Sequence, residues 1–331
     1  MSTIVHATPI KVVRGFAAAQ AHAHLTSHIP VVHRCDYEFD TPQEIIHFDT
    51  DLHLAGVPLR RWVVGDLGHP QAVAFCFRAT WNTPRHTFWA HIRIDPALSA
   101  IDQVRIGDQL MQTVQQWAAA AGAQFLRLMS HPDSSGQQLL ERHGYRHIGT
   151  EQKYVLDVAH SAVTTPPQLD IPGFRVTTLA ELMRTHEDAV EQACQLHAAI
   201  SLDVPMPDEP VVTITKFRRL LGEDLDPSHY LLAMVDEVMV GESILMESDD
   251  DPAIYWQHAT GVIPAYRGKG IAKHLKLHAI ATAKAVGVRQ LFTWMETSNL
   301  PILHLNHELG FAEYVAPGAA VYVYERPLSL A

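Results

Sequence analysis

The stretch GVIPAYRGKGIAKHLKLHAIATAKAVG, residues 261–287, decides the fold of the second half of the chain. An apolar segment that predicts a strand stops at Pro264, and a loop containing Gly268 and Gly270 follows. A long helical pattern then begins near Ile271. Glycine permits the turn and lets a ligand approach the backbone closely. Because the first N–H groups of a helix point back into such a loop, the stretch predicts an anion site at the positive end of a helix dipole.

The basic side chains of this loop also favour an anionic ligand. Arg267 and Lys269 add positive charge beside the glycines, and a pyrophosphate fits such a loop. Two familiar phosphate loops are excluded, because the pattern GxxxxGK[ST] is missing and GKGIAK, residues 268–273, lacks the third glycine of GxGxxG. Taken alone, the loop is either a phosphate site or a glycine-rich turn with solvated basic side chains.

The chain contains an internal repeat. AAAAGAQFLRLMSHPDSSGQQLLERHGYRHI in the first half and AKAVGVRQLFTWMETSNLPILHLNHELGFAEY in the second each predict a helix end, a strand, a turn, a short helix and a Gly-aromatic pair. Gly122 matches Gly287 and Gly144 matches Gly310, at offsets of 165 and 166 residues. The register hardly drifts, so the repeat predicts two copies of one domain.

A segment rich in proline and small polar residues separates the two copies. It reads AHSAVTTPPQLDIPG, residues 159–173, and its three prolines break regular structure. We therefore predict a first domain over residues 1–158, a linker over 159–173 and a second domain over 174–331.

The apolar periodicity predicts the same order of elements in both copies, with strands first and then alternating helices and strands. In the second copy we expect strands at 174–179, 230–235, 238–246, 253–263, 290–295 and 320–326, and helices at 181–202, near 217–221, from 271 onward and at 299–309. In the first copy we expect strands near 61–66, 72–79 and 87–94 and a helix at 104–121. This order is typical of an α/β (α+β) fold in which each domain is a mixed, mostly antiparallel sheet flanked by helices.

Composition narrows the class of protein. The 331 residues are 47% hydrophobic, which allows a large core, and the formal net charge is −11. An acidic chain is a poor match for nucleic acid, so we expect no nucleic-acid partner. We expect no membrane partner either, because no run approaches the roughly 20 apolar residues of a membrane span. An acidic surface tolerates cationic small molecules or peptides.

The cysteines and histidines predict neither disulfides nor metal. Cys35, Cys76 and Cys194 are far apart and odd in number, which favours a reducing interior. We expect no metal site, because the 22 histidines show no convincing His-x-x-x-His or Cys-x-x-Cys spacing. The first residues show no signal-peptide pattern, so we expect a cytoplasmic location.

The second half resembles a known enzyme family. RGKGIA, residues 267–272, fits the pattern [QR]-x-x-G-x-[GA] and follows VIPAY, which fits V-x-P-x-x. Downstream, NLPILHLNHELGF resembles N-x-x-A-x-x-x-Y-x-x-x-G-F, with Asn299, Gly310 and Phe311 at the matching positions. Over residues 174–331 the chain resembles the GNAT N-acetyltransferases. The duplicated arrangement resembles the tandem-GNAT proteins, a group that includes mycothiol synthases.

The resemblance implies acetyl-CoA as co-substrate. The loop backbone would bind its pyrophosphate through Arg267, Gly268, Lys269, Gly270, Ile271 and Ala272. Main-chain groups of Val262 and Ile263 would pair with the pantetheine arm like an added strand. The thioester would enter a gap between the strands HATGVI and FTWMET, with Asn299 at its mouth.

The chemistry would be direct attack of an amine on the thioester. The Val262 N–H would stabilise the oxyanion. Where the family has a tyrosine that acts as the acid, this chain has Asn306. An amide cannot act as that acid, so Asn306 either hydrogen-bonds the sulfur or packs beside the cofactor channel.

Several side chains are candidates for the general base. They are Glu242, Glu247, His258 and Glu296. Strand alternation places His258 and Thr260 on one face of their strand and Ala259 and Gly261 on the other, without showing which face meets the substrate.

The first copy has lost much of this pattern. Its loop, DPALSAIDQVRIGDQL, keeps one glycine and spaces Pro96 and Gly107 three residues too widely. Asp133 stands at the position of the helix-starting asparagine, and Leu140 at the tyrosine position. We expect this domain to bind CoA poorly and to close the substrate pocket or stabilise the other half.

Three functions remain open from the sequence. The first is an N-acetyltransferase acting on a small-molecule or peptide amine from the second domain. The second is a non-catalytic CoA-binding or regulatory protein. The third is an unrelated nucleotide-binding enzyme. Monomer and homodimer are both compatible with the sequence.

Overall fold

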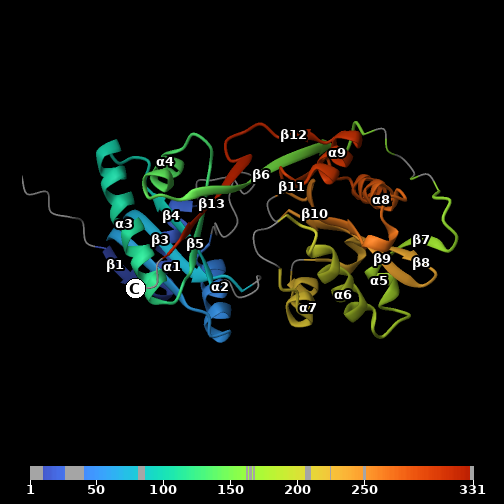
Figure 1. Ribbon diagram of the computed structural model, residues 1–331, viewed down its shortest axis with the longest axis horizontal. Coiled ribbons are helices and arrows are strands. Elements are labelled where there is room, and N and C mark those ends of the chain that lie inside the picture. Colours follow the sequence, from blue (N-terminus) through green and yellow to red (C-terminus); the bar gives the residue numbers. More distant parts are fainter. Residues whose placement is uncertain are drawn as a thin grey trace, which may run out of the picture. The chain divides into compact units, whose positions relative to one another are not determined.

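The structure is a computed structural model that describes residues 10–26, 41–80, 86–161, 163, 166, 168–205, 210–223, 225–248 and 251–328. The chain divides into two compact units (Figure 1). The first unit comprises Met1–Thr150 and Ala316–Ala331, and the second comprises Glu151–Val315. Each unit is described by itself below.

The first unit is one sheet with helices packed on it. In chain order its elements are β1 (Ile10–Val13), α1 (Gly15–Thr26), α2 (Pro42–Leu54), β2 (Leu59–Asp66), β3 (His69–Arg78), β4 (Thr87–Ile94), α3 (Ala100–Ala120), β5 (Phe125–Ser130), α4 (Ser135–Arg142) and β13 (Ala320–Pro327). The strand order is β1-β2-β3-β4-β5-β13, and only the β4–β5 pair is parallel among the pairings described here.

The second unit has the same plan. Its elements are β6 (Arg146–Asp157, of which 151–157 lie in this unit), β7 (Phe174–Thr178), α5 (Leu179–Leu182), α6 (Ala189–Ser201), α7 (Ile214–Glu223), η2 (Pro227–His229), β8 (Tyr230–Val235), β9 (Val238–Glu247), β10 (Ile254–Val262), η3 (Pro264–Tyr266), α8 (Ile271–Ala285), β11 (Gln290–Glu296), α9 (Leu300–Glu308) and β12 (Ala312–Glu313). The strand order is β6-β11-β10-β9-β8-β7, with β12 beside β6 and β10–β11 parallel. The predicted duplication and the mixed, mostly antiparallel sheets are confirmed.

Each unit takes one strand from the other half of the sequence. Strand β13, near the end of the chain, pairs with β5 in the first unit. Residues 151–157 of β6 pair with β11 in the second. The compact units therefore differ in composition from the consecutive domains 1–158 and 174–331 that the repeat predicts. A repeat in sequence does not say which sheet a last strand joins. Of the linker 159–173, residues 162, 164, 165 and 167 lie outside the described residues.

Helices cover both faces of the second unit's sheet. Helix α8 packs on one face through Ile271, Leu275 and Ala279. Helices α5, α6 and α7 pack on the other, where Ile200 and Phe217 join the core. Burial of these side chains supplies the main free energy that holds the layers together.

Two predicted helices differ from the observed ones. The single helix expected at 181–202 is two helices, α5 and α6, separated by turns at 183–188. The helix expected at 104–121 begins at Ala100, because the Ser99 side chain accepts a hydrogen bond from the Asp102 N–H and caps it. Gly107 is therefore an interior helix residue, packed close to Ile94 and Leu139.

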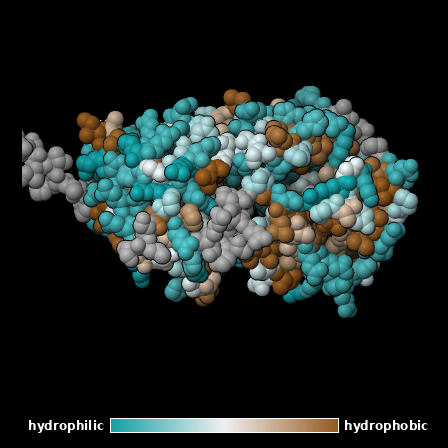
Figure 2. Space-filling view, in the orientation of Figure 1, coloured by the Kyte–Doolittle hydropathy of each residue, from teal (hydrophilic) through white to brown (hydrophobic). Residues whose placement is uncertain are grey.

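The surface matches the acidic, polar composition. The face shown in Figure 2 is mostly hydrophilic, with hydrophobic residues in small scattered groups. Among the described helices, none has the length and apolar character needed to cross a membrane.

Candidate functional site

A gap opens between two parallel strands of the second unit. Strands β10 and β11 are paired only over Ile254–Trp256 and Gln290–Phe292. Beyond this point β10 remains paired with β9 as far as Val262, and β11 remains paired with β6. The second half of β10 therefore presents an open edge, where the family resemblance implies a gap.

Val262 presents its main chain to this open edge. The Ile263 N–H donates to the Val240 carbonyl on β9 at 3.0 Å. Because main-chain groups alternate in direction along a strand, those of Val262 and Thr260 face the gap. The Val262 carbonyl accepts from Arg267 Nε at 2.9 Å, which leaves its N–H for a ligand.

Ile263 does not offer the pairing expected of it. Its N–H is used by Val240, and its carbonyl accepts from the Tyr266 N–H at 3.0 Å. The Ile263 N–H and carbonyl are thus bonded within the protein, to β9 and to the turn of η3, which the apolar strand pattern cannot show. Val262 and Thr260 are the residues left at the open edge.

A cavity of about 570 Å³ lies at the end of this gap. It is lined by Ile200, Asp203, Val204, Thr260, Gly261, Val262, Tyr266, Arg267, Gly268, Gly270, Ile271, Ala272, Lys273, Asn299, Pro301, Ile302, His304, Leu305 and Glu308. The end of α6, the end of β10, the glycine loop and the starts of α8 and α9 thus form one site. Most residues predicted to hold a cofactor meet here, whereas Lys269 and Ile263 are not among the lining residues.

The start of α8 offers unoccupied N–H groups to the cavity. Its N-cap residue is Gly270, and no side chain caps it. No acidic residue lies in its first turn. The first N–H groups of a helix have no partner within the helix, so they and the helix dipole are available to an anion.

The loop requires glycine for its backbone angles. Gly268 and Gly270 have φ of 74° and 82°, in the left-handed region that other residues rarely adopt. A Cβ added at Gly268 would contact nothing within 4 Å, so conformation and not space selects glycine there.

The basic residues of the loop have internal partners. Arg267 forms an ion pair with Asp203, which follows α6. Lys269 Nζ lies 5.0 Å from the centroid of the Tyr266 ring. Arg267 therefore ties the loop to the end of β10 and to α6. The attraction for an anion comes chiefly from the helix start.

Asn299 and Asn306 have different positions on α9. Asn299 is the N-cap residue and lines the cavity, and its side chain makes no capping hydrogen bond. Asn306 is 1% exposed and lies outside the cavity lining. Its Nδ2 is 3.6 Å from Met295 Sδ, and its Oδ1 has no hydrogen-bond partner among the described residues.

Two of the four candidate bases have local structural partners. Glu296 accepts hydrogen bonds from the N–H and hydroxyl of Ser298 and so shapes the turn before α9. Glu247 accepts from the Tyr255 hydroxyl at 2.7 Å. Neither carboxylate lines the cavity.

His258 occupies a β-bulge. The register between β10 and β9 shifts between Gln257 and Ala259, so His258 is the extra residue. Thr260 hydrogen-bonds Ser243, whereas His258 lies near His197 and Glu242. Adjacent strand residues such as Glu242 and Ser243 face opposite sides. The expectation that His258 and Thr260 share a face is therefore wrong, because the bulge breaks the alternation.

The surroundings of His258 lower its pKa from the usual histidine value. Crowding by the surrounding protein and the neighbouring His197 lower its pKa, against a smaller opposite effect of Glu242. Its side chain nevertheless keeps an exposed edge.

Glu242 belongs to a buried cluster that the sequence did not reveal. It is fully buried, and its Oε1 lies 2.7 Å from His197 Nδ1. Its Oε2 accepts from the Tyr230 hydroxyl. Burial and the adjacent carboxylate raise the pKa of Tyr230 well above its usual range, so the hydroxyl remains a donor. One histidine on an amphipathic helix carries no pattern that would single out His197.

A buried lysine lies on the opposite face of the sheet. Lys276 of α8 is 2% exposed, and its Nζ donates to Gln257 Oε1. Gln257 Nε2 donates to Ser243 Oγ at 3.0 Å, which is 2.9 Å from Thr260 Oγ1. This polar chain links α8 to the strand that lines the cavity. Burial lowers the pKa of Lys276 to about 7.

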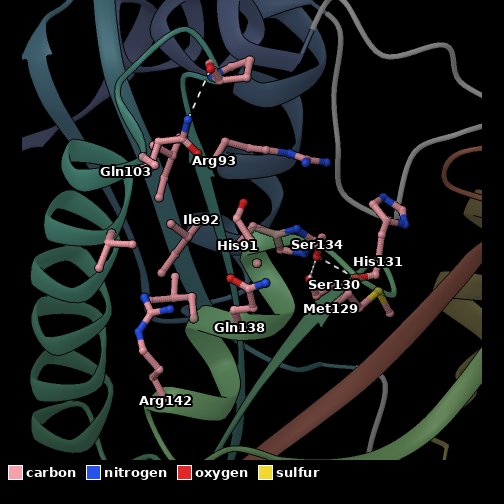
Figure 3. A pocket seen from close by; sticks show the side chains of 17 residues that line it. His91, Ile92, Arg93, Gln103, Met129, Ser130, His131, Ser134, Gln138 and Arg142 are labelled. Carbon is pink, nitrogen blue, oxygen red and sulfur yellow. Dashed lines mark hydrogen bonds between the residues drawn. The ribbon is translucent and has the colours of Figure 1, made fainter.

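The first unit keeps the corresponding gap. Strands β4 and β5 pair only over Thr87–Trp89 and Phe125–Arg127, and a cavity of about 300 Å³ lies beyond. Figure 3 shows His91 and Ile92 from β4 on one side and Ser130, Ser134 and His131 on the other.

The first unit has no free helix start at this cavity. The N-cap hydroxyl of Ser99 accepts from the Asp102 N–H at 3.2 Å and donates to the Asp102 carboxylate at 2.7 Å. The carboxylate thus occupies the position that favours an anion. Gln103 donates to the carbonyls of Pro96 and Leu98 and fills the loop.

Two sequence correspondences for the first unit were wrong. Gly107 lies inside α3, so its spacing from Pro96 does not describe the loop. The loop is in fact shorter, with three residues from Pro96 to Ser99 where the second unit has six from Pro264 to Gly270. The N-cap residue of α4 is Ser134 and not Asp133, which adopts φ of 57° before it.

One histidine spacing was overlooked in the sequence. His274 and His278 are four residues apart on α8, and their Nε2 atoms are 3.1 Å apart. In the part of the chain that the structure describes, no group of three or more possible metal ligands is present. Two imidazoles alone do not make a structural zinc site, which takes four ligands.

Three kinds of comparison relate the chain to known proteins. Residues 190–311 match the family model described as "Acetyltransferase (GNAT) family". Mycothiol acetyltransferase of Renibacterium salmoninarum is 23% identical over 219 residues, which cover 64% of this chain and 61% of that protein. Mycothiol acetyltransferase of Geodermatophilus obscurus is 24% identical over 201 residues, covering 59% of this chain and 62% of that protein. The match thus spans about three fifths of these relatives' length.

Two solved structures share the fold over nearly the whole chain. One is a GCN5-related N-acetyltransferase from Sphaerobacter thermophilus, with a TM-score of 0.66 and 18% identity over 97% of this chain and 95% of that one. The other is a tandem GNAT protein from the clavulanic acid biosynthesis pathway, with a TM-score of 0.68 and 16% identity over 97% and 99%.

Proposed function

We propose that the second unit, in which residues 190–311 match the GNAT acetyltransferase family model, transfers an acetyl group from acetyl-CoA to a primary amine of a small molecule or peptide. One observation carries the proposal. The open edge of β10 and the uncapped start of α8 border the same cavity, so one ligand can meet both.

Acetyl-CoA fits these two features. The loop and helix start, residues 267–272, supply N–H groups for the pyrophosphate. The Thr260 main chain supplies strand-like pairing for the pantetheine arm, and the Val262 N–H beside it remains for the thioester oxygen. The gap beyond Trp256 then receives the thioester, and Asn299 borders it from α9.

The reaction needs little beyond positioning and one proton acceptor. The amine nitrogen attacks the thioester carbon, and the carbonyl electron pair moves to oxygen. A main-chain N–H at the open edge, for which we keep Val262, stabilises this oxyanion. The C–S bond then breaks, and CoA leaves as a thiolate that takes a proton. Asn306 is buried away from the cavity, so we assign it to packing and not to acid catalysis.

Two of the three cysteines lie in the described part of the chain. Cys76 and Cys194 are buried and free, and Cys35 lies outside the described residues. A cytoplasmic location, where disulfides are rare, is part of the proposal.

The test is acetyl-CoA turnover with a panel of primary amines that includes the substrate of mycothiol acetyltransferases. We expect acetylated product and an equal amount of free CoA with at least one amine. Thermal stabilisation by CoA with no product from any amine would instead favour a non-catalytic CoA-binding protein. Stabilisation by ATP or NAD in preference to CoA would favour an unrelated nucleotide-binding enzyme.

A further inference from the structure

We propose that His197 takes the proton from the acceptor amine, and that Glu242 and Tyr230 hold its ring for this task. This role rests on the proposed function of the second unit. It assigns a catalytic residue on α6, a helix that contains none of the base candidates found in the sequence.

The geometry is that of an oriented base. Glu242 Oε1 lies 2.7 Å from His197 Nδ1, and Tyr230 donates to the other carboxylate oxygen. A carboxylate on Nδ1 fixes the tautomer with the proton there and leaves Nε2 as the acceptor. The Nε2 makes no hydrogen bond to any described residue, and the side chain is 16% exposed. The ring is thus held firmly and still open on one side.

The position of α6 brings this ring toward the reacting strand. Ile200 lines the cavity and approaches β10 so closely that a Cβ on Gly261 would lie 2.2 Å from its side chain. His197 is three residues earlier, on the same face of the helix. It therefore lies over the preceding part of β10, toward the bulge at His258. This part of the strand borders the opening gap, whereas the cavity itself is lined from α6 by Ile200 and not by His197.

The surroundings of His197 come from three strands and one helix. Glu242 on β9 hydrogen-bonds its ring, and Tyr230 on β8 donates to the other carboxylate oxygen of Glu242. His258 on β10 is near, and α7 contributes the uncharged ring of Phe217. Burial lowers the pKa of His197, but the hydrogen bond and charge of Glu242 outweigh this effect and raise the pKa overall.

The proposed step moves two protons and two electron pairs. The acceptor enters as an ammonium, and His197 Nε2 takes one proton, which frees the nitrogen lone pair. This pair forms the C–N bond, and the C–S bond breaks with its pair leaving on sulfur. The second proton of the nitrogen passes to the thiolate. The products are the amide, CoA-SH and protonated His197, which returns its proton to water.

The pH dependence of kcat/KM tests this role. A base must be neutral, so activity of the wild-type chain should rise with pH through an apparent pKa above the usual histidine value of about 6.5. His197→Gln should lower kcat about 100-fold and leave acetyl-CoA affinity unchanged. It should also remove the fall in kcat/KM toward low pH, which is the acidic limb of the pH profile. His186→Gln, an exposed histidine before α6, is the matched control.

The pH profile of kcat/KM also tests the roles of Glu242 and Tyr230, which position His197. In Glu242→Gln the charge that raises the pKa is gone while burial remains, so the acidic limb should move to lower pH. Tyr230→Phe provides a second variant if Glu242→Gln does not fold. Imidazole added to His197→Ala should restore part of the rate, which it would not do for a packing residue.

The outcomes separate this role from the function. Turnover by His197→Gln with an intact acidic limb overturns the role of His197 and leaves the proposed function standing. Loss of the acidic limb of the pH profile in His258→Gln, and not in His197→Gln, also overturns the role of His197 and leaves the proposed function standing. No turnover of any amine by the wild-type chain overturns both.

Discussion

At the scale of single residues, Gly270 combines two requirements. Its left-handed backbone favours glycine, and its place at the start of α8 favours an anion. Gly270→Asp would place a carboxylate where the pyrophosphate binds. We expect it to weaken acetyl-CoA binding about 100-fold or more, as measured by calorimetry.

The control for this change is Gly270→Asn. Asparagine has nearly the same shape as aspartate, tolerates the left-handed region and carries no charge. It should share the backbone cost and lose much less affinity. Equal losses in the two variants would attribute the effect to backbone strain and not to an anion site.

A substitution of Asn306 tests whether this residue contributes to packing or to catalysis. Its Oδ1 is buried and has no hydrogen-bond partner in the described part of the chain, which costs stability. We expect Asn306→Leu to raise the free energy of unfolding by about 1 kcal/mol and to leave kcat within threefold. A loss of kcat with unchanged folding would show that the amide acts on the reacting atoms.

The role of a residue can be predicted from the sequence when the residue type alone shows what the backbone requires at that position. Gly268 and Gly270 are predictable, because the left-handed backbone of this strand-to-helix turn favours glycine. His197 is not, because its role depends on Glu242 and Tyr230, each more than 30 residues away in the chain. The same holds for Asn306, since its spacing suits the cofactor channel but its side chain faces Met295.

At the scale of elements, the two helix starts differ, and we propose that this difference decides which unit binds an anion. Helix α8 begins at an uncapped glycine, whereas α3 begins with Ser99 and its own Asp102. Apolar periodicity predicts both helices but not their first turns. It also misses the β-bulge at His258 and the break between α5 and α6. These irregularities span only one and six residues, which is too short to disturb the apolar pattern.

The buried Lys276 of α8 predicts a pH dependence of stability. Its pKa is about 7 in the folded chain and about 10.4 when unfolded. Between these values the unfolded state binds more protons, so the stability of the fold rises with pH. At neutral pH the buried amine therefore costs stability.

Lys276→Met isolates this contribution. We expect the variant to be more stable than the wild type by about 2 kcal/mol near pH 7, a difference that shrinks toward pH 10. Denaturant unfolding of both proteins across this range measures it. A constant difference would mean that the amine does not titrate on folding.

At the scale of the whole molecule, the exchanged strand β13 belongs to the first unit. Arg127 on β5 is 1% exposed, and its Nε and Nη2 donate to Glu325 Oε2 on β13 at 2.8 and 2.7 Å. Glu325→Ala removes this partner of a buried cation. We expect it to destabilise the first unit by about 3 kcal/mol and leave acetyl-CoA affinity unchanged within twofold.

The matched control is Glu313→Ala, an exposed carboxylate on β12 of the second unit. It should change neither quantity by much. Weaker acetyl-CoA binding in Glu325→Ala would mean that the second unit's site depends on β13. The repeat predicts two copies, but the partner of a last strand is set by sheet edges that appear only in three dimensions.

The central claim is that the chain binds one acetyl-CoA, at the glycine loop of the second unit, because the helix start of the first unit is capped by its own carboxylate. Calorimetric titration of the full chain with acetyl-CoA tests this most directly. We predict a stoichiometry of one per chain and loss of that site in Gly270→Asp. Two sites per chain, or one site that survives in Gly270→Asp with unchanged affinity, would contradict the account.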